Sequence, residues 1–75
     1  MFGNLKKQVL KKKIRQVEAG NIELEAKISW MEGLLEYEGD TLSQKQKDDY
    51  ALVISQDKAQ IETNKSYIRY VKPLI

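Results

Sequence analysis

The segment LLEYEGDTLSQ, residues 34–44, lies between two long apolar repeats and contains the signals for a reversal of the chain. Gly39 can adopt the left-handed backbone conformation that often follows a helix, and Asp40 or Thr41 can cap the helix that comes next. The run Thr41-Leu42-Ser43-Gln44 also matches the capping-box pattern. These residues predict a turn at 39–41.

Apolar residues recur at alternating intervals of four and three on both sides of this turn, which is the spacing of helices that pack along one seam. The first series is Leu10, Ile14, Val17, Asn21, Leu24, Ile28, Met31 and Leu35, and the second is Tyr50, Ile54, Asp57, Ile61, Asn64, Ile68 and Val71. The sequence therefore predicts an all-α fold, an antiparallel two-helix hairpin of coiled-coil type.

Reversal at Gly39 also predicts a register for the hairpin. It places Ile28 opposite Tyr50, Leu24 opposite Ile54, and Asn21 opposite Asp57. The last pair would form a polar layer of the kind that fixes register in coiled coils. The alternative is that both polar side chains reach solvent at the edge of the seam.

The ends of the two helices follow from single residues. Asn4 is a good N-cap, so the first helix is expected at about 4–38. Pro73 lacks the N–H that another helical turn would need, so the second helix is expected at about 42–72. Residues 1–75 then form one helical-hairpin domain.

Gly20-Asn21 allows a different architecture, because glycine within a helix costs about 1 kcal/mol relative to alanine. Asn21 could cap a new helix whose first turn contains Glu23 and Glu25. The chain would then form three helices, near 4–19, 22–38 and 42–71. The four-three spacing passes through Asn21 without a slip and favours the hairpin.

Five apolar residues of the first helix do not fit the seam. At 100 degrees per residue they gather on the opposite side of the helix. A two-helix hairpin can bury only one face of each helix, so this second face is expected to bind a protein partner or another copy of the chain. The residues are Ile22, Ala26, Trp30, Leu34 and Tyr37.

Charge is unevenly distributed although the formal net charge is only +2. The cations gather near the two termini, and the hairpin would bring them to one end. An alternative function is therefore non-specific binding of nucleic acid phosphates, although the two arginines of the chain disfavour sequence-specific recognition. The residues are Lys6, Lys7, Lys11, Lys12, Lys13, Arg15, Arg69 and Lys72.

The sequence gives almost no support to catalysis. Histidine and cysteine are absent, and the carboxylates have no metal-loop spacing. We therefore expect no enzyme activity, no cofactor, no metal and no small-molecule substrate. A role at a membrane surface is disfavoured because the apolar stripe of the N-terminal lysine-rich stretch is short.

These features together predict an assembly or adaptor module without enzyme activity. Its size and lysine-rich composition suggest a small phage or bacterial accessory protein. We expect a cytoplasmic location, or a virion-associated one if a phage encodes the chain.

Overall fold

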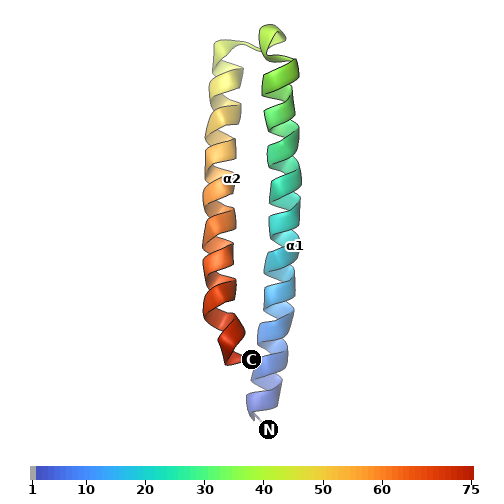
Figure 1. The fold of residues 1–75 in the computed structure, drawn as a ribbon, viewed down its shortest axis with the longest axis vertical. Helices are drawn as coiled ribbons and strands as arrows, with labels where there is room; N and C mark the ends of the chain where they lie inside the picture. The colour runs from blue at the N-terminus through green and yellow to red at the C-terminus, as the bar shows by residue number, and fades with distance from the viewer. Residues whose placement is uncertain (1) are drawn as a thin grey trace.

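The computed structural model describes residues 2–75 as two antiparallel helices that lie side by side (Figure 1). Helix α1 spans Phe2–Tyr37, the 3-10 turn η1 spans Gly39–Thr41, helix α2 spans Gln44–Val71, and the 3-10 turn η2 spans Lys72–Leu74. The molecule is a rod of 60 × 14 × 14 Å. The predicted all-α hairpin is confirmed.

Helix α1 runs through Gly20 and Asn21 without interruption, so the three-helix alternative does not form. Asn21 is only 8% exposed. Its side chain is hydrogen-bonded within the seam rather than capping a new helix. Asn4 lies within α1, which already begins at Phe2, so the predicted N-cap at Asn4 was wrong.

The core is the predicted seam. Every buried hydrophobic residue of the described chain belongs to the two four-three series. Leu24, Leu35, Tyr50 and Val53 pack around the central cluster and are half-buried. The buried residues are Ile14, Ile28, Met31, Ile54, Ile61 and Val71.

The seam partner of Asn21 differs from the predicted one. The side-chain amide of Asn64 donates to Asn21 Oδ1 at 2.7 Å, so Asn21 pairs seven residues beyond Asp57, its predicted partner. A heptad pattern is unchanged by a shift of seven residues, so the apolar positions cannot distinguish the two pairings. The observed pairing joins the two amides by one hydrogen bond, and Asn64 Oδ1 accepts a second one from Gln60 Nε2 at 2.8 Å. The predicted register would instead have placed Asn64 against Ile14.

Asn21 and Asn64 should be energetically coupled, because each amide loses the hydrogen bond between them when the other is replaced. We expect the Asn21→Leu/Asn64→Leu double variant to be about 1–2 kcal/mol more stable than the sum of the two single variants predicts. Urea denaturation of the four proteins measures this coupling. Additive effects would contradict the hydrogen-bonded layer.

The turn uses different caps from those predicted. Among the described residues no glycine has a positive φ, so Gly39 does not adopt the left-handed conformation. The Thr41 hydroxyl donates back to the Glu38 carbonyl at 2.8 Å and is not the cap of α2. Ser43 is the N-cap instead, with Ser43 Oγ accepting from the Gln46 N–H at 3.1 Å and Gln46 Oε1 accepting from the Ser43 N–H at 2.8 Å.

The C-terminal end follows the expectation from Pro73. Helix α2 stops at Val71, and η2 continues the chain as a single tighter turn. Leu74 lines a shallow hollow with Gly3, Lys6, Lys7 and Leu10 of α1. The last residues therefore lie against the start of α1.

Candidate protein-interaction surface

Most of the apolar residues that did not fit the seam lie on the exposed side of α1. Ile22 is 67% exposed, Trp30 61% and Tyr37 82%. Ala26 is also exposed, whereas Leu34 is half-buried. Within the described chain nothing covers this surface, which we call the back of α1.

Trp30 is held in place by a contact across the hairpin. Its ring meets Tyr50 of α2 edge to face, with the ring centroids 6.3 Å apart and the planes at 86°. This is a preferred geometry for aromatic pairs. The indole therefore contacts α2 through Tyr50, while most of its surface remains open.

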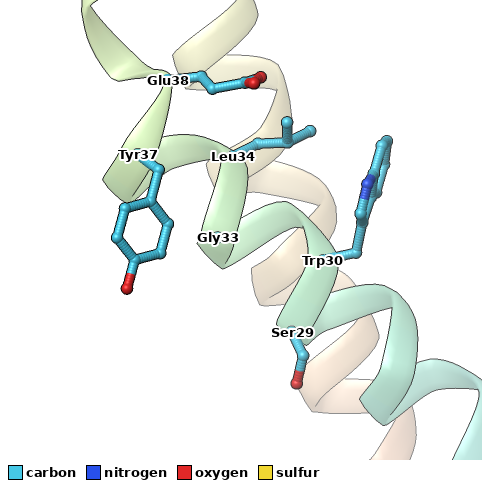
Figure 2. A pocket seen from close by; sticks show the side chains of 6 residues that line it. All are labelled: Ser29, Trp30, Gly33, Leu34, Tyr37 and Glu38. Atoms are coloured by element: carbon cyan, nitrogen blue, oxygen red, sulfur yellow. The ribbon is translucent and has the colours of Figure 1, made fainter.

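Gly33 makes a gap in the back of α1. Figure 2 shows the rings of Trp30 and Tyr37 projecting on either side of Gly33, with Ser29 one turn below. Together with Leu34 and Glu38, these residues line a shallow and largely apolar hollow. A Cβ atom built on Gly33 meets no other atom within 4 Å. The helix backbone is therefore accessible at this point.

Small residues mark the centre line of the back of α1. Ala19, Ala26 and Gly33 are seven residues apart and occupy the heptad position opposite the seam. Ala26 was predicted from the sequence as part of this surface, but Ala19, Ser29 and Gly33 were not. The heptad spacing was the signal that could have found them. Small residues allow two helix axes to approach closely.

The basic residues near the two termini lie at one end of the rod (Figure 1). All eight that the sequence analysis selected are exposed. The two ends of the chain lie near each other, since Leu74 lines the same hollow as Lys6 and Lys7.

The Asn21–Asn64 layer divides the rod into two parts of opposite charge. Residues 1–20 and 65–75 contain nine Lys or Arg and one acid, which gives +8. Residues 22–63 contain ten acids and four bases, which gives −6. The end with the termini is therefore strongly basic, and the part nearer the turn is acidic.

Two ion pairs cross from helix to helix in the acidic part. Lys27 Nζ lies 3.3 Å from Asp57 Oδ2, and Lys58 Nζ lies 3.8 Å from Glu32 Oε2. Asp57 Oδ2 is buried and makes no hydrogen bond within the described chain. Its one favourable contact there is the ion pair with Lys27, so this pair compensates for a carboxylate inside the seam.

Within residues 2–75, no group of three or more His, Cys, Asp or Glu side chains is placed to hold a metal ion. Neither described helix is long and apolar enough to cross a bilayer.

Comparisons with protein-family models, with curated proteins and with solved structures give no significant match for this chain. The two candidate sites are the back of α1 and the basic end.

Proposed function

We propose that this chain is an assembly or adaptor module without enzyme activity, which self-associates through the back of α1. The observation that supports the proposal most directly is the open apolar surface around Ile22, Trp30 and Tyr37. Contiguous apolar surface on a soluble protein usually marks an interaction site. Tryptophan and tyrosine are also enriched among the residues that dominate binding energy.

The thin core adds to this argument. No large side chain of the described residues is less than 2% exposed. The seam also contains three polar residues, Asn21, Asp57 and Asn64. A domain of this size with no disulfide or metal is seldom stable by more than about 3–5 kcal/mol. Association would bury further apolar surface and stabilise the folded state by mass action.

The biological setting is part of the same proposal. A role among small phage or bacterial accessory proteins, in the cytoplasm or a virion, is supported by chain length and lysine content alone.

Sedimentation velocity over a range of concentrations tests self-association. We expect the unmodified chain to shift from monomer to a larger species as concentration rises. Trp30→Ala should weaken this association by about 30-fold, because loss of an aromatic anchor typically costs about 2 kcal/mol of binding energy.

Tyr70→Ala is the matched control, since Tyr70 is an aromatic residue of α2 that is 76% exposed and lies away from the back of α1. It should associate like the unmodified chain. A monomer at all concentrations would refute the proposal, and so would equal weakening by the two substitutions.

A second candidate function is non-specific binding of nucleic acid at the basic end. The supporting observation is that the fold brings two basic stretches, distant in sequence, to the same end of the rod. Lysine neutralises phosphate without reading bases, so such binding would depend on charge.

Titration of a labelled duplex oligonucleotide at several salt concentrations tests the second candidate. Affinity should fall as salt rises, with a log–log slope of about −0.9 for each phosphate neutralised. Lys12→Gln should remove about one phosphate contact and make the slope shallower by about 0.9. Lys45→Gln, near the turn, should leave the slope unchanged. Binding that does not respond to salt would exclude this function.

A further inference from the structure

The back of α1 has an internal symmetry. Ile22 and Trp30 are each four residues from Ala26, and Ala19 and Gly33 are each seven residues from it. Within residues 19–33, these four residues therefore follow the same order outward from Ala26 in both directions, first a large residue and then a small one. Two-fold symmetric dimers require such a self-complementary patch, because residue i contacts residue j and residue j contacts residue i.

We propose that a second copy of this chain docks antiparallel on the back of α1, with the two-fold axis at Ala26. This inference rests on the proposed self-association and specifies its partner and geometry. Ala26 then meets Ala26 of the second copy. Ile22 of each copy meets Trp30 of the other, and Ala19 of each copy meets Gly33 of the other. The two hairpins together form a four-helix assembly with α1 helices at its centre.

The contacts fit this arrangement sterically. Ala19, Ala26 and Gly33 lie on the line of closest approach, where small residues allow the axes to approach within about 8 Å. Gly33 has open space above it. Trp30 already contacts Tyr50, which reduces the side-chain freedom that would be lost on docking.

Charge selects the antiparallel orientation. A parallel dimer would place the +8 part of one rod beside the +8 part of the other. The antiparallel dimer instead places the basic stretch of each copy beside the acidic turn of the other. With the axis at Ala26, the end of α1 at Tyr37 lies beside Arg15 of the other copy, so the basic residues 11–15 come near the turn that contains Glu38 and Asp40. Opposite charges across an interface suppress the wrong orientation.

Single-cysteine variants test the geometry, because the chain has no cysteine of its own. A disulfide requires Cα atoms about 4.4–6.8 Å apart, so it reports close pairing. Under mild oxidation, Ala26→Cys should form dimers. Equal amounts of Ala19→Cys and Gly33→Cys should give mostly the mixed dimer. Leu52→Cys, on the exposed outer side of α2, is the control and should remain largely monomeric.

The outcomes separate this inference from the proposed function. Homodimers of Ala19→Cys that form as readily as the mixed dimer would overturn the antiparallel geometry, even if sedimentation shows a dimer. Disulfides of Leu52→Cys that form as fast as those of Ala26→Cys would overturn the choice of face. A chain that is monomeric in sedimentation would refute self-association itself.

Salt dependence gives an independent measurement on the unmodified chain. The antiparallel dimer should dissociate more readily as ionic strength rises, since salt screens the attraction between its basic and acidic parts. The association constant of the dimer should fall about tenfold as the ionic strength rises from about 0.01 M to about 1 M. Association that strengthens with salt would indicate like charges side by side and would overturn the proposal.

Discussion

Replacement of Met31 by alanine is expected to unfold much of the hairpin at room temperature. Met31 is 2% exposed and belongs to the central cluster with Ile28, Ile54 and Ile61. Truncation of a buried methionine costs about 2–5 kcal/mol. A core of this size supplies only about 3–5 kcal/mol. The loss therefore approaches the whole stability of the fold.

Far-ultraviolet circular dichroism during urea denaturation, at one fixed low concentration, measures this effect. Leu52→Ala is the control because Leu52 is 57% exposed. It should change the free energy of unfolding by no more than about 0.5 kcal/mol. If the two variants unfold at the same urea concentration, Met31 does not lie in a closed core.

Ala26→Glu is expected to abolish self-association and leave the hairpin folded. Ala26 is exposed, and glutamate is nearly as good a helix former as alanine, so the single chain should tolerate the change. In the proposed dimer the two new carboxylates would meet on the symmetry axis. Like charges brought together at an interface cost several kcal/mol. The dissociation constant should therefore rise at least about 100-fold.

Ala59→Glu is the matched control, since it makes the same substitution at an exposed position of α2. Sedimentation velocity compares the two variants, and circular dichroism checks that both remain helical. If Ala26→Glu associates as strongly as Ala59→Glu, the back of α1 is not the interface.

The two helices and their seam could be predicted because their signal is periodic. Eleven or more consecutive positions contribute to such a pattern, so one unfavourable residue does not erase it. Gly20 illustrates this, since α1 continues through it despite its low helix propensity.

The details of the turn could not be predicted because two capping boxes overlap in the sequence. Thr41-Leu42-Ser43-Gln44 and Ser43-Gln44-Lys45-Gln46 both match the pattern. The structure uses the second, because the Thr41 hydroxyl bonds to the end of α1. A local pattern cannot choose between two caps that differ only in such a contact.

The register could not be predicted for a similar reason. Apolar periodicity repeats every seven residues, so only the polar members of the seam distinguish one alignment from the next. Asn21 has two polar candidates, Asp57 and Asn64, and a pairing assumed to be symmetric about Gly39 chose the first. In the structure Asn21 is hydrogen-bonded to Asn64, and Asp57 forms an ion pair with Lys27.

The candidate interface was predicted in part. Large residues such as Ile22 and Trp30 stand out in a sequence because they add apolar area. Ala19 and Gly33 do not, because their contribution is the space that they leave for another helix. Their position on α1 becomes meaningful only when the direction of the seam is known.

The position of the two chain ends determines how the rod would respond to mechanical load. The N- and C-termini both lie at the end of the rod that is opposite the turn (Figure 1). Tension applied between them would peel α2 from α1 one layer after another and would not slide the helices past each other. The layer containing Ile14 would open early, the Asn21–Asn64 amides next, and the cluster around Met31 last. The helices of such a rod would separate at low tension, starting from the chain termini. They would pair again from the turn when the tension is released.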